Sequence, residues 1–362
     1  MENTLNTVIK ELLNKGTIIP AHPLVLNQDR KLDEERQRRL TRYYIAAGVG
    51  GVAVGVHTTQ FEIRNPEVNL LETVLKLAAE EIEKAQSDNP FIKIAGIVGT
   101  TSNAIKEAEL AAKYGYNLGL VSLGGLKDYS ETELIKHVED VSKIIPVFGF
   151  YLQPAVGGHL LSYKFWRDFV EIPNVHAIKV AAFNRYQTLD VVRAVCTSPR
   201  RNEIALYTGN DDNIVADLLT PYRFTINDKI VEKRFVGGLL GHWAVWTKKS
   251  VELFKEIKQC VANDSSQIEK LLSKGIEVTD MNEVIFDAHN SFHGCIPGIH
   301  EVLKRQGLME GRWCLNPKEE LSEGQIEEID RIYKMYPHNT DDEFIKEFLE
   351  RDKTQIHAGA IL

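Results

Sequence analysis

Lys179 is the residue whose type and position most clearly suggest covalent chemistry. It lies near the end of an apolar run at 175–180, which has the length and the β-branched content of a strand. Alternate residues of a strand share a face, so Lys179 shares one with Val175 and Ala177. A lysine partly withdrawn from water has a lowered pKa and can attack a carbonyl carbon to form an imine. The alternative is a strand-end lysine that reaches solvent, since lysine is seldom buried unpaired.

A phenol and a pair of threonines could assist this amine. Tyr151 ends the apolar run at 146–151, which we expect to form the strand beside that of Lys179. Its phenol could pass protons to a reacting carbonyl. Thr58 and Thr59 follow another short apolar run, and their backbone N–H groups and hydroxyls could hold a carboxylate. The plainer interpretations are a tyrosine at the rim with its hydroxyl in water, and ordinary turn chemistry for the threonines.

Three histidines follow strand ends that a closed barrel would make neighbours. His242, His22 and His57 come at the ends of the eighth, first and second expected strands. They could act together as acid–base groups or as donors to a polar substrate, because imidazole titrates near neutral pH. A stronger version makes them the ligands of a divalent metal. The plainer alternative is three separate histidines that are hydrogen-bonded locally.

The elements that would position these residues alternate between strand-like and helix-like segments. The expected strands are 17–21, 51–56, 92–97, 118–122, 146–151, 175–180, 204–208 and 235–240. The expected helices are 5–13, 33–47, 69–85, 102–114, 130–143, 163–170, 186–196, 213–219 and 248–261. This alternation predicts an α/β fold with a parallel sheet. Eight units in about 245 residues match a (β/α)8 TIM barrel, in which catalytic groups lie at the C-terminal ends of the strands.

A doubly wound open sheet is the rival fold, but the first β/α turn lacks the glycine-rich phosphate-binding pattern. We expect residues 1–262 to form the barrel and residues 263–362 to form a C-terminal helical extension. Segments 281–289, 299–306, 322–335 and 341–351 are the clearest helices of that extension. Residues 221–233 are expected to be an irregular insertion before the eighth strand. Trp243 and Trp246 follow that strand, where they could wall the mouth or pack against the C-terminal helices.

Composition limits the classes of function. The 362 residues are 43% hydrophobic and carry a formal net charge of −8. The chain therefore lacks the excess of positive charge that indicates nucleic-acid binding. Four widely spaced cysteines indicate reduced thiols in a cytoplasmic protein. The N-terminus has no secretion-signal pattern, and no apolar stretch approaches the roughly 20 residues that cross a bilayer. We therefore expect no membrane association.

Five motifs in order make the chain resemble the dihydrodipicolinate synthase/N-acetylneuraminate lyase superfamily of class I aldolases. The family has a Thr-Pro pair where this chain has His22-Pro23, and a Gly-x-[Ser/Thr]-Thr-Gly-Glu loop where it has Gly55-Val56-His57-Thr58-Thr59-Gln60. The family's Tyr-x-x-Pro motif is matched by Tyr151-Leu152-Gln153-Pro154, and its Gly-Ile-Lys strand by Ala177-Ile178-Lys179. The family's Ser-Gly-Asp-Asp turn is matched by Thr208-Gly209-Asn210-Asp211-Asp212. The resemblance covers nearly the whole chain and implies a barrel that acts on a 2-oxo acid without a cofactor.

The resemblance also implies roles for single residues. Lys179 would form the imine and Tyr151 would relay protons. The loop at Thr58 and Thr59 would hold the carboxylate of the 2-oxo acid. Gly209 and Asn210, in the turn after the seventh strand, would contact substrate. His22, His57 and His242 complete the expected substrate-binding set, by the argument from barrel order above.

Departures from the family pattern narrow the substrate. The synthases carry an arginine where this chain has Val156, and valine cannot grip a carboxylate as an arginine fork does. They also carry a tyrosine pair where this chain has Leu123-Gly124-Gly125-Leu126. Replacement of Gly-Glu by Thr59-Gln60 alters the carboxylate loop. The chain is therefore not expected to be a true dihydrodipicolinate synthase.

The leading hypothesis is a lyase or aldolase that forms a Lys179 imine with a pyruvate-type 2-oxo acid. It would cleave, condense or dehydrate a hydroxy-2-oxo acid or sugar-acid derivative, in a homo-oligomer that is a dimer or a tetramer. A second hypothesis is a non-catalytic barrel that binds a carbonyl metabolite. A third is a metal-dependent hydrolase, but such barrels usually carry a His-x-His pair on the first strand, and this chain has only His22 there.

Overall fold

The fold is built around eight parallel strands. A computed structural model describes residues 4–85, 89–263 and 265–359. The strands are β1 (Ile18–Pro20), β2 (Gly51–Val54), β3 (Ile92–Ile97), β4 (Leu118–Val121), β5 (Val147–Leu152), β6 (Val175–Ala181), β7 (Ala205–Thr208) and β10 (Phe235–Leu240). Their order is β1-β10-β7-β6-β5-β4-β3-β2. Ala21 bridges to Ala53 in parallel fashion, and the His22 N–H donates to the Ala53 carbonyl at 2.8 Å. This contact brings β1 to β2 and closes the sheet, so the predicted TIM barrel is confirmed.

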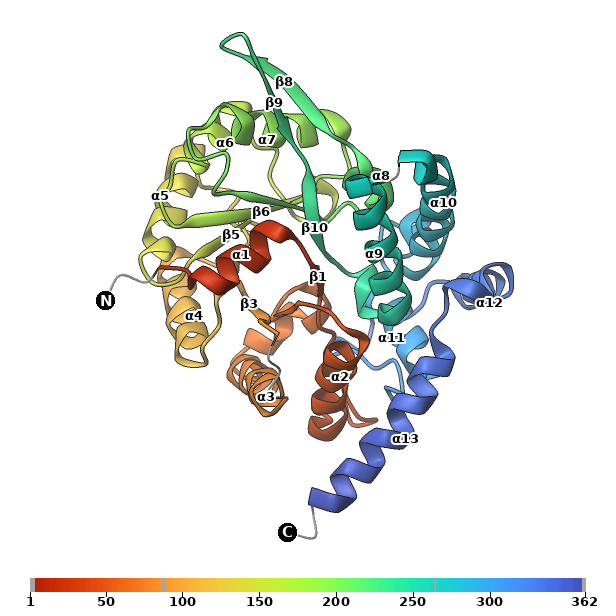
Figure 1. Cartoon of the computed structure of the whole chain (residues 1–362). Coiled ribbons are helices and arrows are strands. Elements are labelled where there is room, and N and C mark those ends of the chain that lie inside the picture. The colour runs from red at the N-terminus through yellow and green to blue at the C-terminus, as the bar shows by residue number, and fades with distance from the viewer. Residues whose placement is uncertain (1–3, 86–88, 264, 360–362) are drawn as a thin grey trace.

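A helix follows each strand and covers the outside of the barrel (Figure 1). These helices are α2 (Glu34–Ala47), α3 (Leu71–Lys84), α4 (Thr101–Lys113), α5 (Glu131–Ser142), α6 (Tyr163–Phe169), α7 (Arg185–Thr197), α8 (Ile214–Leu219) and α9 (Thr247–Asn263). Their bounds lie within two residues of the predicted ones. Local signals explain this agreement, since the predicted capping box between Ser130 and Glu133 starts α5 and the Asp33 side chain caps α2.

One end of the barrel is closed by the first helix, α1 (Thr7–Lys15). Its buried side chains, Ile9 and Leu13, belong to an apolar cluster in the barrel interior that also contains Phe148 and Tyr207. The Tyr207 hydroxyl donates to the Leu13 carbonyl at 2.9 Å. A substrate can therefore enter only at the opposite end, where the strands have their carboxyl ends.

The segment expected to be an irregular insertion is a β-hairpin, so that prediction was wrong. Strand β8 (Tyr222–Ile226) pairs antiparallel with β9 (Lys229–Lys233). Asn227 and Asp228 form the turn, and both have positive φ, as a two-residue hairpin turn requires. The hairpin projects from the barrel in Figure 1.

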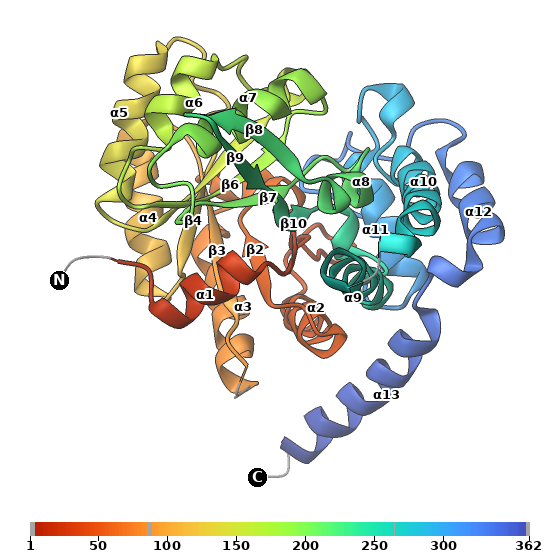
Figure 2. The same ribbon diagram turned by 45° about the horizontal axis from the view of Figure 1, so that its top comes forward.

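The C-terminal part is helical, as expected, but its first helix is much longer than predicted. The helices are α10 (Ile268–Ile285), α11 (Cys295–Arg305), α12 (Gln325–Met335) and α13 (Asp342–Gly359). Helices α10 to α12 lie against one side of the barrel, and α13 extends from them and contacts α2 (Figures 1 and 2). The division into a barrel domain at 1–262 and an extension at 263–362 stays a prediction.

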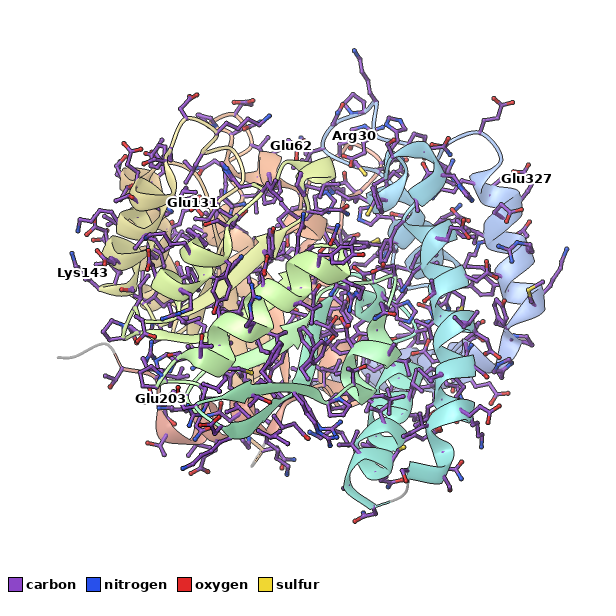
Figure 3. All side chains as sticks on the ribbon, turned by 90° about the horizontal axis from the view of Figure 1, so that it is seen from above. Arg30, Glu62, Glu131, Lys143, Glu203 and Glu327 are labelled. Carbon is purple, nitrogen blue, oxygen red and sulfur yellow. The ribbon has the colours of Figure 1, made fainter. Side chains whose placement is uncertain are left out.

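Polar contacts tie the extension to the loops above the barrel. Figure 3 shows Arg30 where the barrel meets the C-terminal helices, and this guanidinium donates to the Cys314 carbonyl. The Gln60 side chain accepts a hydrogen bond from the Leu315 N–H at 2.6 Å. Among the described residues, no helix combines the length and the apolar character that crossing a membrane would need.

Candidate active site

A cavity of about 130 Å³ lies at the open end of the barrel, where the strands end. This volume is below the roughly 300–1,000 Å³ typical of pockets for drug-sized ligands, so the cavity suits a small molecule. Its walls come from the ends of six strands, from the loops after β2 and β5, and from the helical extension. The lining residues are Ala21, Val56, His57, Thr58, Phe61, Leu120, Phe150, Leu152, Gln153, Val156, Lys179, Ala181, Phe183, Gly209, Asp211, Gly241, Phe286, Phe292, Cys295 and Ile299.

Lys179 faces this cavity from β6. Ala177 belongs to the apolar cluster of the barrel interior and Ala181 to the cavity wall, so Lys179, between them on the same face, points inward. Its Nζ lies 4.5 Å from the centroid of the Phe150 ring, and among the described residues it has neither a hydrogen bond nor an ion pair. Burial lowers the pKa of the Lys179 ammonium well below its usual range, and the Asp211 charge offsets part of this effect. The site thus holds an amine that loses its proton easily.

Gly209 makes room for this amine. A Cβ at Gly209 would lie 2.4 Å from the Lys179 Cε and 2.9 Å from the Ala181 Cβ. The Gly209 N–H donates to the Val180 carbonyl at 2.7 Å, which continues the pairing of β7 with β6. Gly209 was predicted to contact substrate. It lines the cavity, and its absent side chain is what allows the lysine to extend.

Tyr151 does not accompany Lys179, which corrects the expected proton relay. In the pairing of β5 with β6, Phe150 lies opposite Lys179 and Tyr151 lies opposite Val180. Paired residues of adjacent strands project to the same face, so Tyr151 points outward. Its ring packs on Trp166 of α6, with centroids 5.0 Å apart, and is fully buried there. Phe150 occupies the place beside the amine that was expected for the phenol.

Asp211 is the acid–base group that the sequence argument did not select. It follows β7 and lines the cavity with Lys179. Its Oδ1 accepts a hydrogen bond from the His242 N–H at 3.3 Å, and its carbonyl accepts one from the Asn282 side chain at 2.7 Å. Burial raises the pKa of the Asp211 carboxyl above its usual range, and the Lys179 charge opposes part of that rise. The signal was present in the Thr208-to-Asp212 turn, but the resemblance drew attention to Gly209 and Asn210.

Asn210 is structural, contrary to expectation. It is fully buried and does not line the cavity. Its Oδ1 accepts from the Phe183 N–H at 2.9 Å, and its Nδ2 donates to Asp217 at 2.9 Å. The Thr208 hydroxyl also donates to Asp217, at 2.7 Å. Asn210 therefore joins the loops after β6 and β7 and holds Asp211 in place.

The two threonines after β2 have different tasks. They lie in a short 3-10 turn, His57–Thr59. The Thr59 hydroxyl donates to the His22 carbonyl at 2.7 Å and accepts from the Gly55 and Val56 N–H groups, so it fixes the loop. Thr58 lines the cavity, and its buried hydroxyl has no hydrogen-bond partner among the described residues. Of the pair, Thr58 is the one free to bind a ligand.

The three histidines do not converge, so the proposed imidazole cluster was wrong. His57 lines the cavity, where removal of water and then the Lys179 charge lower its pKa. His22 is fully buried between the barrel and α2, with Nε2 2.9 Å from the Thr41 hydroxyl and Nδ1 2.9 Å from the Pro23 carbonyl. The two imidazoles come from different segments: His22 follows β1 and bonds Thr41 of α2, whereas His57 lies in the 3-10 turn after β2.

His242 lies outside the cavity as well. Its buried ring faces a separate hollow beside α9 and α10, with the Trp246 ring centroid 6.0 Å away. Trp243 and Trp246 are buried and pack against helices, so they do not wall the mouth. Across the described residues, no group of three or more histidine, cysteine, aspartate or glutamate side chains is arranged to hold a metal ion. The three-histidine metal site is thus ruled out by the positions of its ligands.

The helical extension supplies part of the wall, which the sequence did not reveal. Phe286, Phe292, Cys295 and Ile299 reach the cavity from the end of α10 and from α11. They line the same cavity as Lys179. These residues lie more than a hundred positions after the lysine, and a helical pattern alone does not say which strand end a helix will cover.

Comparisons with known proteins agree with this fold. The model of the dihydrodipicolinate synthetase family matches residues 14–221. N-acetylneuraminate lyase 2 of Escherichia coli O6:H1 is 24% identical over 319 residues, which cover 87% of this chain and 92% of that protein. The structure of N-acetylneuraminate lyase from Fusobacterium nucleatum complexed with pyruvate superposes with a TM-score of 0.69 at 19% identity, covering 91% of this chain and 99% of that one. Dihydrodipicolinate synthase from Oceanobacillus iheyensis gives 0.72 at 15% identity, with the same coverage.

Proposed function

The chain belongs to the dihydrodipicolinate synthetase family, and we propose that it is a class I lyase or aldolase in which Lys179 forms an imine with a pyruvate-type 2-oxo acid. One observation carries this proposal: the Lys179 amine lies inside the mouth of the barrel, without an ion pair and with a lowered pKa. An amine that is neutral near physiological pH can attack a carbonyl carbon, whereas an ammonium cannot.

The proposed reaction proceeds through the imine. The neutral amine attacks the C2 carbonyl of a 4-hydroxy-2-oxo acid, and the resulting carbinolamine loses water. The iminium then accepts the electron pair of the C3–C4 bond as the 4-hydroxyl loses its proton, which releases an aldehyde and leaves an enamine. Protonation at C3 and hydrolysis return pyruvate and free Lys179. Loss of the 4-hydroxyl with a proton from C3 would give dehydration from the same imine.

Asp211 is proposed to carry the protons in these steps. It lines the same cavity as Lys179, and its raised pKa allows it to donate or accept a proton near neutral pH. His57 is the other titratable group near the amine, but its pKa is lowered, so it acts as a neutral hydrogen-bonding group. This assignment replaces the phenol of Tyr151, which lies behind the strand.

The carboxylate of the 2-oxo acid is proposed to bind at the loop after β2. The free Thr58 hydroxyl is the donor that supports this placement. The rest of the substrate differs from that of the synthases, since Val156 lines the cavity where those enzymes carry an arginine. We therefore infer a substrate other than the aspartate semialdehyde used in dihydrodipicolinate formation.

Replacement of the amine tests the proposal. Lys179→Arg keeps the charge but cannot form an imine. We expect this variant to release no pyruvate from any member of a panel of 4-hydroxy-2-oxo acids on which the wild type is active. Lys233→Arg is the matched control, because the pKa of Lys233 is also lowered by burial, but its Nζ bonds the Arg201 carbonyl outside the mouth. Turnover retained in Lys179→Arg would refute the mechanism.

Assembly and location stay predictions. We expect a homo-oligomer, either a dimer or a tetramer, in the cytoplasm. Sedimentation velocity on the full chain measures the subunit number directly. If the protein formed a pyruvate imine but cleaved no substrate, the alternative of a non-catalytic barrel for a carbonyl metabolite would be favoured.

A further inference from the structure

Five phenylalanine rings line the cavity that holds Lys179. Phe150 lies beside the amine, and Phe61 and Phe183 follow the ends of β2 and β6. Phe286 and Phe292 arrive from the helical extension. Rings from distant segments thus converge on the space that the substrate would occupy beyond its 2-oxo acid end.

Polar groups are few in the same wall. Lys179 and Asp211 are the charged side chains among the described residues that line the cavity. The mechanism already uses both, and Thr58 is assigned to the carboxylate. His57 and Gln153 remain as polar side chains. A chain of hydroxyls or a second anion bound here would lose its water without gaining enough partners, which is unfavourable.

Two of the five rings are held at a conformational cost. Phe183 has φ of +51° and Phe292 has φ of +66°. Bulky residues rarely adopt this left-handed conformation, which glycine or asparagine would adopt without strain. The Asn210 side chain holds the backbone at Phe183 by accepting a hydrogen bond from the Phe183 N–H. The Phe292 N–H donates a hydrogen bond to the Asp287 carbonyl at 3.0 Å.

The strained rings meet each other across the mouth. Their centroids lie 6.1 Å apart, with planes at 74°, which is an edge-to-face pair. Both side chains are only partly buried; Phe292 packs in part against the main apolar cluster, whereas Phe183 does not belong to it. One ring follows the strand of the imine-forming lysine, and the other belongs to the extension. Strain at a cavity is an indication that the side chain has a role in binding.

We propose that the substrate half beyond the 2-oxo acid is apolar, an aromatic or alkyl aldehyde in the condensing direction, and that Phe183 and Phe292 grip it. This inference rests on the proposed function, because it needs the Lys179 enamine. In condensation, the enamine C3 attacks the aldehyde carbon, the aldehyde oxygen takes a proton, and hydrolysis of the imine releases a 4-hydroxy-2-oxo acid. The apolar group of the aldehyde would pack against this edge-to-face pair.

A comparison of aldehydes tests the substrate class. The full chain is incubated with pyruvate and, in separate reactions, benzaldehyde, glyceraldehyde or succinic semialdehyde, and kcat/KM is measured from pyruvate consumption. We expect benzaldehyde to exceed both others by about 10-fold or more. Preference for the hydroxylated or the anionic aldehyde, or no condensation with any of them despite a pyruvate adduct on borohydride reduction, would overturn the inference and leave the imine intact. Absence of the adduct would instead remove the proposed function and this inference with it.

Glycine variants test the two rings without straining the fold. Phe183→Gly and Phe292→Gly remove the side chains and suit the left-handed backbone, so we expect both variants to fold. Each should lower kcat/KM for benzaldehyde by about 10- to 100-fold while the yield of reduced pyruvate adduct stays unchanged. Tyr186→Ala is the control, since this aromatic residue is 82% exposed and lies outside the cavity wall. Unchanged benzaldehyde kinetics in both glycine variants would contradict the proposal.

Discussion

At the scale of single residues, reactivity depends on what surrounds one amine. Lys179 has apolar neighbours and a lowered pKa, and only the neutral amine attacks a carbonyl. The rate of pyruvate imine formation should therefore rise with pH and reach half its plateau below pH ~10.4, the ordinary titration point of lysine. Stopped reduction with borohydride at a series of pH values measures this midpoint. A midpoint at or above the ordinary value would mean that the amine is not desolvated.

Asp211 should affect both turnover and this midpoint. Removing the charge in Asp211→Asn takes away the group that raises the pKa of Lys179, so the midpoint should move to lower pH. Turnover should fall by about 10²- to 10⁴-fold, as for loss of a general acid–base group. Asp228→Asn is the control, because Asp228 is exposed in the hairpin turn and does not line the cavity. A lower turnover without any shift of the midpoint would indicate a purely structural role.

Tyr151→Phe provides the opposite test. The phenol is buried on α6 with its hydroxyl near the Leu161 backbone, outside the cavity. We expect the variant to keep wild-type kcat and KM in the pyruvate-release assay. A loss of turnover comparable with that of Asp211→Asn would show that the phenol reaches the reacting atoms after all.

The residue-level errors have one physical cause. The strand of Lys179 was predictable, and Lys179 shares the interior face with Ala177 as expected, but Val175 belongs to the outer apolar cluster. For Tyr151, the face depended on the register, and β5 shifts by one residue against β6 between Val147 and Phe148. A shift of one residue moves a side chain to the other face of a sheet. No motif in a single sequence reports such an irregularity.

At the scale of elements, the position of the Lys179 side chain depends on close packing between β6 and the end of β7. Gly209→Ala would place a methyl group 2.4 Å from the Lys179 Cε. We expect the free energy of unfolding to fall by about 1–3 kcal/mol, as for overpacking elsewhere. The yield of pyruvate adduct should fall as well, because the lysine must move. Gly124→Ala is the control, since its nearest contacts would be 3.3 Å and 3.4 Å. Unchanged adduct yield in Gly209→Ala would contradict the assigned role of this glycine.

The bounds of helices and strands were predictable where local sequence signals set them. They were not predictable where contacts with distant segments set them. The strands and helices of the barrel follow the apolar pattern and their caps. Helix α10 was placed too late because Gly275 interrupts the helical pattern, although this glycine lets the helix approach Val215 of α8, where a Cβ would lie 2.9 Å from the Val215 Cβ. The hairpin at Asn227 and Asp228 carried a turn signal that we did not use.

At the scale of the whole molecule, the C-terminal part completes the site and is anchored back to the barrel. Asp352 of α13 accepts hydrogen bonds from Arg39 at 2.9 Å and from Arg42 at 2.6 Å, both on α2. Burial alone would raise the pKa of Asp352, but the two guanidiniums outweigh it and lower the pKa. A lowered pKa means that this stabilisation is present above the pKa of the unfolded carboxyl and is lost as pH falls through the folded value.

Asp352→Asn should therefore destabilise the protein in a pH-dependent manner. At pH 7 we expect the free energy of unfolding to fall by about 1.5–3 kcal/mol, the worth of hydrogen bonds to a charged group. Below pH ~3.9, the ordinary value for aspartate, the difference from wild type should shrink. Urea titrations at several pH values measure it. Glu72→Gln, which breaks an exposed pair with Lys113, should change little. A difference that stays constant down to low pH would rule out the ionic explanation.

Peptide mapping of the borohydride-reduced pyruvate adduct tests the central claim most directly. Among the described residues, three lysines have pKa values that burial lowers: Lys179 inside the mouth, and Lys233 and Lys258 outside it. If position in the mouth determines reactivity, mass spectrometry will find the reduced adduct on the peptide that carries Lys179 and none on the peptide that carries Lys233. An adduct on Lys233, or on no lysine at all, would contradict the account.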